Sequence, residues 1–441
     1  MKTRVWTVAA GAGAVLATLC AGLPYEVPLA LAVAVPPTLV VALWLAVRGD
    51  ADERGALVPI FLAAVAVRIV VALAVAYAAP DGYFALDDQR YAALGQELAR
   101  HWAGESGFPV DLHGAIGYYA WNALLYTLVG PVPLAVTLLN GVLGGVASIL
   151  AWRIARDLGG VEAARLAALL TAFFPSLVLW SSLNLKDPWA LVAILLCLRG
   201  AQRLAAGPSL VALAAIGIGI AGLGELRGYL AVVAAAAIGV GLALPRLRGP
   251  RASFAMVALL ALGAIAVVSL GPIEGLGEEA SLESLDRARR ELAIGASAYQ
   301  ADADVSTPAS ALRFLPLGLT YFLLAPAPWQ VWNTRQLLTL PEMLAWYALI
   351  PQIVAGLAYT LRRRFASALP LATFALFATV SYALVESNLG TAYRHRAQVV
   401  VLFLVFGAVG LARRGERSRA AARSTATERT HPQPVQGRLL A

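Results

Sequence analysis

Long apolar runs broken by short polar connections dominate this sequence. The runs do not alternate apolar and polar residues, so they predict membrane-spanning α-helices and not the strands of a barrel. About twelve of them approach the roughly 20 residues with which a helix crosses a bilayer. They lie near residues 5–23, 27–47, 56–79, 131–152, 164–182, 188–203, 209–224, 229–245, 252–270, 338–360, 366–385 and 397–412. The pattern predicts an all-α, polytopic membrane protein with an outer-face juxtamembrane helix and outer loops.

The composition agrees with this class. Of the 441 residues, 60% are hydrophobic and only 14% are charged, and the mean hydropathy is +0.73. A soluble protein of this length needs more charged side chains to cover its exterior. The formal net charge of +8 comes mostly from arginine, much of it after Leu411. It indicates membrane topology and contact with lipid, and no nucleic-acid partner.

Basic residues at the ends of the spans predict the orientation. Lys2, Arg4, Arg48 and Arg54 flank the first two spans, and the positive-inside rule places them in the cytoplasm. Alternation then predicts a multi-pass protein of the plasma (inner) membrane, with both termini cytoplasmic and the active site on the outer face. The polar connections expected outside are 81–118, 181–188, 271–313 and 386–396. The apolar stretch 314–326 breaks the alternation, so we expect it to be re-entrant or a half-span.

This layout divides the chain into three parts. They are an N-terminal transmembrane hairpin at 1–55, a catalytic core at 56–412 with outer loops 80–118 and 271–313, and a disordered basic cytoplasmic tail at 413–441. The second outer loop mixes acids with arginines and is expected to contain one amphipathic surface helix. The amino end has the form of a signal peptide, but another span follows at once, so we expect an uncleaved first span. No internal repeat typical of inverted-repeat transporters is visible.

A polar segment between apolar runs, Asp81–Trp102, holds the first candidates for chemistry. From Leu86 onward its apolar residues, including Tyr91, recur at helical spacing, which predicts a helix along the membrane surface. Asp87 and Asp88 stand at its start. A carboxylate there is suited to take a proton from an acceptor hydroxyl or amine as a general base. The alternative is that either aspartate caps the helix.

The next outer connection carries an unusual lysine. The two lysines of the chain are Lys2 and Lys186, and Lys186 lies on the predicted outer side, against the positive-inside bias. Its ammonium group is suited to bind a phosphate, and Asn184 is a polar candidate beside it. The alternative is a snorkelling lysine paired with Asp187, itself a cap for the helix that Pro188 begins.

Basic residues also gather at the outer ends of two other spans. Arg394, His395 and Arg396 precede the last span, and this cluster indicates an anionic ligand such as a lipid phosphate. Contact of the two arginines with lipid headgroups is the alternative. Arg227 lies in GELRGY between two apolar runs. It either reaches a donor phosphate or forms an ion pair with Glu225 at the membrane edge.

No phosphate-binding glycine loop, zinc-helix signature, nucleophile elbow or ATPase motif occurs. Cys20 and Cys197 both lie in apolar runs, so neither a disulfide nor a thiolate metal site is indicated. We therefore expect no cofactor, and no residue cluster demands a divalent metal. Without a nucleotide-binding element, an enzyme that acts outside the cell needs a donor already carried on a lipid.

Three segments together resemble the GT-C superfamily of membrane glycosyltransferases. They are LDDQRY in the first outer loop, FPSLVLWSSLNLKDP, and NLGTAYRHR before the last span. The resemblance covers about residues 56–412. It is strongest to the bacterial branch related to protein O-mannosyltransferases and aminoarabinose transferases.

This resemblance implies a bacterial cell-envelope enzyme that moves a sugar from a polyprenyl-phosphate donor to a glycan, lipid or protein acceptor. An aspartate of the first outer loop, here Asp87 or Asp88, would be the general base. The implied donor-phosphate ligands are Lys186, Arg227, Arg394 and Arg396, and the implied substrate contacts are Tyr91, Asn184 and His395. Metal dependence varies among these families.

Two departures and two rival functions complete the sequence hypothesis. No WWDYG-like signature and no large soluble carboxy-terminal domain of the oligosaccharyltransferase branch are visible, which disfavours protein N-glycosylation. The rivals are an outer-face glycan polymerase or ligase and a transporter of a lipid-linked substrate. Polar residues collect at the outer ends of the spans and not at mid-membrane, which favours an enzyme.

Overall fold

The computed structural model describes residues 24–80, 82–109, 115–246, 281–293, 295, 297–331 and 333–430. Within these residues the regular structure is helical, and the one β-bridge, between Ala298 and Asn388, is isolated. The all-α prediction is therefore confirmed.

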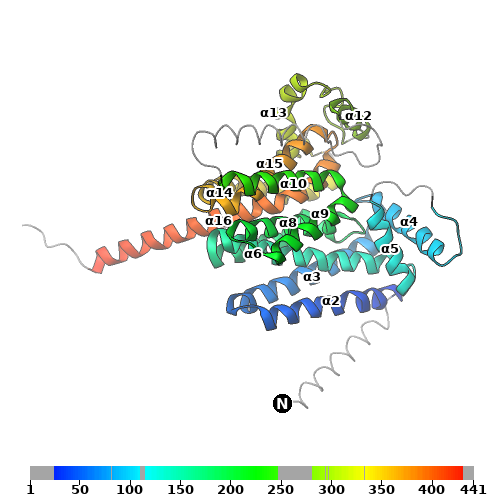
Figure 1. Ribbon diagram of the computed structural model, residues 1–441, viewed down its shortest axis with the longest axis horizontal. Helices are drawn as coiled ribbons and strands as arrows, with labels where there is room; N and C mark the ends of the chain where they lie inside the picture. Colours follow the sequence, from blue (N-terminus) through cyan, green and yellow to red (C-terminus); the bar gives the residue numbers. More distant parts are fainter. Residues whose placement is uncertain are drawn as a thin grey trace, which may run out of the picture.

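The helices keep the labels of Figure 1. In chain order they are α2 (Glu26–Arg48), α3 (Val58–Ala78), α4 (Asp87–Trp102), α5 (Ile116–Val129), α6 (Pro133–Phe173), α7 (Pro175–Ser181), α8 (Asp187–Ala206), α9 (Leu210–Leu226), α10 (Gly228–Ala243), α12 (Leu282–Leu292), α13 (Pro308–Leu324), α14 (Thr334–Arg363), α15 (Phe365–Val385) and α16 (Leu389–Thr430). Short π or 3-10 turns lie at Glu53–Leu57, Leu244–Arg246 and Pro328–Gln330.

Eight helices of the described part of the chain are long and apolar enough to cross a membrane. They are Glu26–Arg48, Glu53–Ala78, Pro133–Phe173, Asp187–Ala206, Gly228–Arg246, Thr334–Arg363, Phe365–Val385 and Leu389–Ala420. The helices α9 and α13 are apolar but shorter. A multi-pass membrane protein is thus confirmed, whereas the number of about twelve spans stays a prediction. Two of those spans, 5–23 and 252–270, lie outside the described residues.

A glycine divides the longest apolar helix in two. The 41 residues of α6 contain Gly160, whose φ of 81° interrupts the helical backbone. Glycine adopts this left-handed conformation without the steric cost that a Cβ imposes. The break falls between the predicted spans 131–152 and 164–182. The sequence predicted that the helix is interrupted between these two spans, and the break at Gly160 confirms this prediction.

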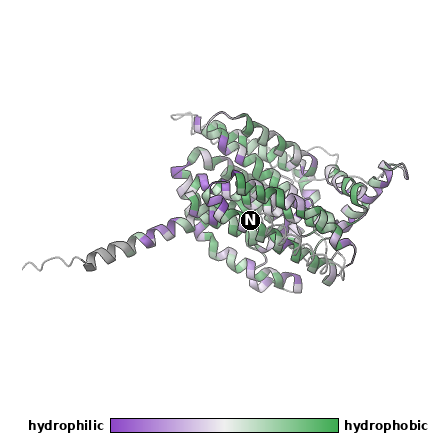
Figure 2. Cartoon of the chain, turned by 90° about the horizontal axis from the view of Figure 1, so that it is seen from below, coloured by the Kyte–Doolittle hydropathy of each residue, from purple (hydrophilic) through white to green (hydrophobic). Residues whose placement is uncertain are grey.

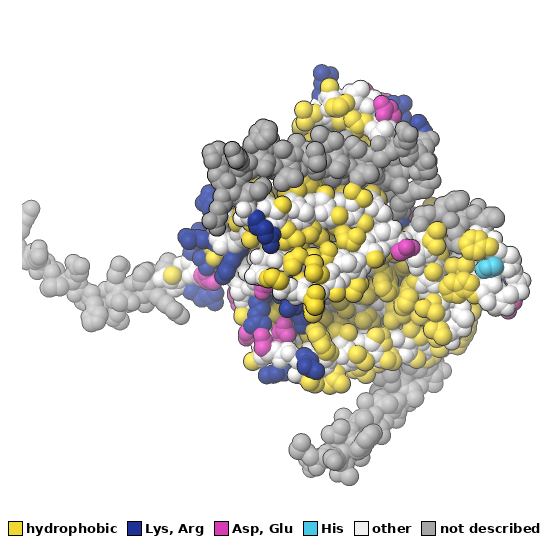
Figure 3. All heavy atoms as spheres, viewed as in Figure 1, with side chains coloured by type: hydrophobic (Ala, Val, Ile, Leu, Met, Phe, Trp, Pro, Cys, Tyr) yellow, Lys and Arg dark blue, Asp and Glu magenta, His cyan; other side chains and the backbone are white. Residues whose placement is uncertain are grey.

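The long helices run side by side, with α4 and α5 at one end of the bundle (Figure 1). The C-terminal part of α16 projects beyond the opposite end. Figure 2 shows hydrophobic positions over most of the bundle and hydrophilic ones on the projecting part of α16. In Figure 3, hydrophobic side chains cover the flank, while Lys and Arg side chains gather near the base of the projection. Ion pairs between distant parts of the described chain join Arg156 to Asp50, Arg153 to Glu53 and Arg199 to Asp157.

Glycines bring the backbones of α14 and α16 into direct contact. A Cβ at Gly356 would lie 1.8 Å from the carbonyl oxygen of Phe406, and a Cβ at Gly410 would lie 2.0 Å from that of Gln352. Small residues allow such close approach between membrane helices, where packing replaces the hydrophobic effect as the driving force. This contact anchors α16, whose first two turns carry the basic cluster of the sequence.

Three predictions about connections can be compared with the helices. The amphipathic surface helix expected in the second outer loop is present as α12. The stretch 314–326 belongs mostly to α13, which begins earlier, at Pro308. The tail expected to be disordered from residue 413 is helical as far as Thr430. Alanine and arginine favour helix there, and no proline lies between residue 389 and Pro432; residues 431–441 lie outside the described part.

Candidate active site

Asp87 opens α4 and contacts the first turns of α16. No side-chain cap forms at this helix start, where Leu86 holds the N-cap position. The Asp87 carboxylate instead accepts a hydrogen bond of 2.6 Å from Nη1 of Arg394. Burial raises the pKa of Asp87, but the guanidinium of Arg394 outweighs it, so the pKa lies below its ordinary value. Asp87 is thus an ionised, half-exposed carboxylate held against a cation.

Asp187 is the buried centre of the charged cluster. It begins α8, whose start is set by Pro188 in the first turn. One carboxylate oxygen accepts from Nε and Nη2 of Arg394 at 3.0 and 2.7 Å. The other accepts from Nη2 of Arg227 and from Nε2 of Gln398, both at 3.1 Å. Two arginines therefore compensate a carboxylate whose side chain is only 5% exposed.

Arg227 reaches Asp187 from the junction between α9 and α10. Its backbone, at φ −155° and ψ 80°, ends one helix and begins the other. Nη1 donates to the hydroxyl of Tyr229 at 2.9 Å and lies 3.0 Å from Nε2 of His395. The predicted alternative was an ion pair with Glu225. The structure pairs Arg227 with Asp187, and Glu225 is exposed.

The hydrogen bonds of His395 define its tautomer. Because a guanidinium only donates, Nε2 of His395 must accept from Arg227. Nδ1 therefore carries the proton and donates to the buried Glu386. Glu386 also accepts from the hydroxyl of Thr391 at 2.6 Å. His395 accordingly links the buried Glu386 to Arg227 and orients the arginine, one residue away from Arg394.

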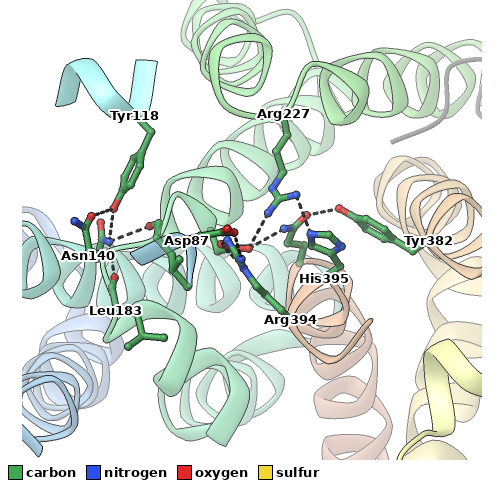
Figure 4. Close-up of polar contacts among 12 residues, drawn as sticks. Asp87, Tyr118, Asn140, Leu183, Arg227, Tyr382, Arg394 and His395 are labelled. Carbon is green, nitrogen blue, oxygen red and sulfur yellow. Dashed lines mark hydrogen bonds and ion pairs between the residues drawn. The ribbon is translucent and has the colours of Figure 1, made fainter. Parts of the chain in front are cut away.

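A closed ring of hydrogen bonds returns from Arg227 to Asp187. Arg227 donates to Tyr229, and the hydroxyls of Tyr229 and Tyr382 lie 2.8 Å apart. Tyr382 donates to Oε1 of Gln398 at 2.5 Å, and Gln398 donates to Asp187. Since the two ends of this series are fixed, the hydroxyl of Tyr229 must donate to Tyr382. Figure 4 shows Arg227, His395 and Tyr382 converging on this cluster.

A second polar cluster lies beside the first and contains Asn184. The hydroxyl of Tyr118 donates to Oδ1 of Asn184 at 2.7 Å, and Nδ2 of Asn140 donates to the same hydroxyl at 2.9 Å (Figure 4). Nδ2 of Asn184 donates to Asn122 at 2.9 Å. Asn184 is fully buried. It joins α5 to the connection before α8 and does not line the cavity described below.

Asp88 and Tyr91 face this second cluster. Burial, and after it the negative charge of Asp88, raises the pKa of Tyr126 on α5. The ring of Tyr91 is buried and packs edge-to-face on Tyr118, with centroids 4.9 Å apart. Neither residue lines the cavity. The sequence hypothesis that Tyr91 contacts substrate therefore gains no support from its position, and Asp87 is the better placed of the two aspartates.

Lys186 and Arg396 are both buried, but they have different surroundings. Lys186 is buried at the N-cap position of α8, and its charge contributes to the lowered pKa of Asp87 after that of Arg394. It is therefore not a lysine that snorkels to solvent. Arg396 donates to the carbonyl of Ala325 at 2.9 Å, at the C-terminal end of α13, and contacts the sulfur of Met343. Residues two apart on a helix point about 200° apart, which separates Arg396 from Arg394.

A cavity of about 520 Å³ lies against Asp87 and Arg394. Its wall comes from the starts of α4, α14 and α16 and from α7. Polar residues on the wall are Ser297, Asn333, Gln336, Thr339, Asn388 and Thr391, and apolar or aromatic ones include Phe84, Leu86, Leu179, Trp180, Leu338, Leu389 and Tyr393. Its charged residues are Asp87, Arg335 and Arg394. The cavity has the volume and the mixed lining typical of ligand sites.

Sequence reasoning missed several members of this site. Arg335 lines the cavity, is exposed, and has its guanidinium 4.3 Å from the ring centroid of Tyr83. An arginine at the predicted outer end of a span, against the positive-inside bias, was the signal that could have identified it. Tyr382 and Gln398 lie within spans and carry no comparable signal, because single polar residues in apolar helices are common packing elements.

No group of three or more His, Cys, Asp and Glu side chains is placed to hold a metal ion in the part of the chain that the structure describes. The carboxylates of Asp87 and Asp187 already have arginines as their cationic partners. The expectation that the protein works without a cofactor stays a prediction.

No protein-family model and no curated protein matches this sequence. Among solved structures, the chain is similar to the crystal structure of the Archaeoglobus fulgidus oligosaccharyltransferase in the apo form. The sequence identity is 14%, the TM-score is 0.46, and the match covers 83% of this chain and 52% of the other. The chain thus spans about half the length of that protein. A similarity of this size does not establish a shared family or activity.

Proposed function

We propose that this protein is a membrane glycosyltransferase of GT-C type. It would transfer a sugar from a polyprenyl-phosphate donor to a glycan, lipid or protein acceptor at the outer face of the membrane. The observation that carries the proposal is the placement of Asp87 and Arg394 on one cavity, at the end of a bundle of membrane helices. A carboxylate and a guanidinium side by side supply the two charges that sugar transfer from a phosphate requires.

The lining of the cavity supports a lipid-linked donor. Leu179 and Leu338 offer apolar contact for a prenyl chain, whereas Asn388 and Thr391 offer hydrogen bonds to a sugar. Leu338 itself is exposed on α14, a membrane-span helix. The donor would therefore enter from the lipid side with its phosphate against Arg394.

The basic residues divide into two groups by their access to the cavity. Arg394 and Arg335 line it and are our candidates for the donor phosphate. Arg227 and Lys186 are buried behind them, where their charges act on Asp187 and Asp87. We therefore assign Arg227 and Lys186 to positioning and electrostatic support instead of direct binding.

The proposed reaction follows from these positions. The ionised carboxylate of Asp87 takes the proton from the acceptor hydroxyl, and the acceptor oxygen attacks the anomeric carbon. The bond between that carbon and the phosphate oxygen breaks, and its electron pair stays on the phosphate. Arg394, and Arg335 if it reaches the same group, stabilise the departing phosphate. Attack on the face opposite the phosphate inverts the anomeric carbon.

The orientation of the site agrees with an outer-face enzyme. Figure 3 shows a group of Lys and Arg side chains near the base of the α16 projection, away from the end where α4 lies. Under the positive-inside rule, that basic end is cytoplasmic. The Asp87 end would then face the periplasm or cell exterior, where nucleotide-sugars are absent and lipid-linked sugars serve as donors.

The test is sugar transfer by the purified protein from a panel of radiolabelled polyprenyl-phosphate sugars to a membrane extract. We expect Asp87→Asn to reduce kcat by about 10²- to 10⁴-fold, the usual contribution of a general base, without loss of donor binding. Glu97→Gln, which changes an exposed carboxylate on the same helix, is the matched control and should keep full activity.

Other outcomes separate the rival functions. Transfer of an entire glycan chain would identify a polymerase or ligase. Absence of transfer with every donor, by protein shown to be folded, would contradict the glycosyltransferase proposal and favour a transporter. Loss of transfer in Asp88→Asn but not in Asp87→Asn would reassign the base.

A further inference from the structure

The ion pair of Asp87 and Arg394 occupies the cavity side of the arginine. Nη1 of Arg394 is bonded to Asp87, which lines the cavity, whereas Nε and Nη2 are bonded to Asp187, which does not. An anion entering the cavity therefore meets a guanidinium whose accessible edge already holds a carboxylate. Binding at this edge requires that the two anions share the guanidinium or that one of them leaves.

The two aspartates hold Arg394 unequally. The side chain of Asp187 is 5% exposed and accepts hydrogen bonds from two arginines and a glutamine. The side chain of Asp87 is 51% exposed and is held by one hydrogen bond to Nη1. A solvent-accessible ion pair contributes little stability, whereas breaking a buried pair leaves an uncompensated charge. Asp87 is therefore the carboxylate that an incoming anion can displace.

A phosphate is a strong competitor for this position. The phosphodiester of a polyprenyl-phosphate sugar carries one negative charge and two non-bridging oxygens, as a carboxylate does, and guanidinium groups bind it in bidentate fashion. Arg335 lies on the same cavity, exposed and stacked on Tyr83, so a second cation is available to the phosphate but is not bonded to Asp87. The balance of charges thus favours phosphate over Asp87 at Nη1.

We infer that a phosphate-bearing lipid bound in the cavity displaces Asp87 from Arg394, so that the ion pair is the resting state of the site and donor binding releases the carboxylate. The inference rests on the proposed function and adds an order of events to it. In the resting protein, Arg394 weakens Asp87 as a base. Once a phosphate neutralises Arg394, the free carboxylate regains basicity next to the sugar that is to be attacked. Acceptor deprotonation is thereby confined to the donor-loaded site.

Lipid binding without turnover tests this inference. The full chain in nanodiscs is titrated with undecaprenyl phosphate, with inorganic phosphate and with undecaprenol. If the pair is closed in about nine molecules out of ten, its removal tightens phosphate binding about tenfold. We expect this decrease in Kd for undecaprenyl phosphate in Asp87→Asn, and no change for undecaprenol. Glu97→Gln removes a charge from the exposed face of the same helix and should leave every Kd unchanged.

The outcomes distinguish failure of this inference from failure of the proposed function. If the wild type binds undecaprenyl phosphate and transfers sugar, but Asp87→Asn binds it no tighter, the displacement is refuted while the function stands. If the wild type binds undecaprenyl phosphate no better than undecaprenol, both proposals fall. If only inorganic phosphate binds more tightly to Asp87→Asn, the ligand is free phosphate and the assignment to a lipid is wrong.

Discussion

Asp187 is the residue on which the charged cluster depends most. Its carboxylate compensates Arg227 and Arg394 in a buried setting and fixes the edge that Arg394 presents to the cavity. The neighbouring residue Lys186 adds positive charge on the same side. Loss of this one carboxylate would remove the buried ion-pair partner that Arg227 and Arg394 share.

The stability of Asp187→Ala tests this dependence. Removing one partner of a buried ion pair costs about 3–5 kcal/mol, so we expect a large drop in the thermal unfolding midpoint in detergent. Asp157→Ala, which removes the partner of Arg199 in a more exposed pair, should cost at most about 1 kcal/mol. Equal shifts in the two variants would show that Asp187 is not the centre of the cluster.

The pH dependence of turnover tests the state of Asp87. A base acts when ionised, so activity persists above its pKa and falls as the pH drops through it. Because Arg394 lowers the pKa of Asp87, the acid limb of kcat/KM should lie below about 3.9, the ordinary value for aspartate. The limb of kcat, which reports the donor-bound enzyme, should lie higher if Asp87 has been released. Unfolding midpoints over the same pH range separate titration from denaturation. An acid limb of kcat/KM above about 3.9 would refute the first statement, and one above that of kcat would refute the second.

At the residue scale, the sequence identified charged residues that the structure brings together, but it did not predict the direction in which each side chain points. Asp87, Arg227, Arg394 and His395 lie at predicted outer ends of spans, and the structure brings them together. Arg396 was grouped with its neighbours because it is close in sequence, but helical rotation directs it to α13. No local sequence pattern reveals the direction of the Arg396 side chain, since that direction depends on which side of α16 faces the site.

At the element scale, the approach of α14 to α16 determines where the first turns of α16 lie. Gly410→Ala would place a methyl group 2.0 Å from the carbonyl of Gln352, and we expect a loss of about 1–3 kcal/mol in stability. Gly217→Ala on α9 meets nothing within 4 Å and should be neutral or slightly stabilising. The measurement is the unfolding midpoint of each variant, and a stable Gly410→Ala would mean that the two helices can separate.

Hydrophobic runs predicted most helices of the described chain to within a few residues, because a bilayer imposes both length and composition. The start of α4 at Asp87 followed from polar and apolar spacing. The helix α5 was not predicted, since its residues were assigned partly to an outer loop. The extension of α16 to Thr430 was missed because basic composition was interpreted as disorder.

At the scale of the whole molecule, we expect the arginine-rich end and the Asp87 end to face opposite sides of the membrane. Single cysteines test this in a background where Cys20 and Cys197, the two natural cysteines, are replaced by serine. Glu97→Cys should react with a membrane-impermeant maleimide on intact cells, and Arg417→Cys only after permeabilisation. Reaction of both residues from the same side would contradict the proposed orientation.

The cavity was beyond prediction from the sequence. Its wall combines residues near 82–87, 175–180, 333–339 and 388–394, which come together only through tertiary packing. Hydropathy assigns each of these segments to a membrane edge but does not specify which edges meet. The candidate chemistry could therefore be inferred as a set of charges, whereas the shape that receives a substrate could not.

The hydrogen-bonded ring through Tyr229, Tyr382 and Gln398 restricts how this site can evolve. Each tyrosine hydroxyl accepts from one neighbour and donates to the next, so the direction of donation is fixed all the way to Asp187. Replacing one tyrosine by phenylalanine leaves a donor without an acceptor on one side and an acceptor without a donor on the other. Among distant homologues that retain Asp187, the two tyrosines should therefore be kept or lost together, as a covarying pair.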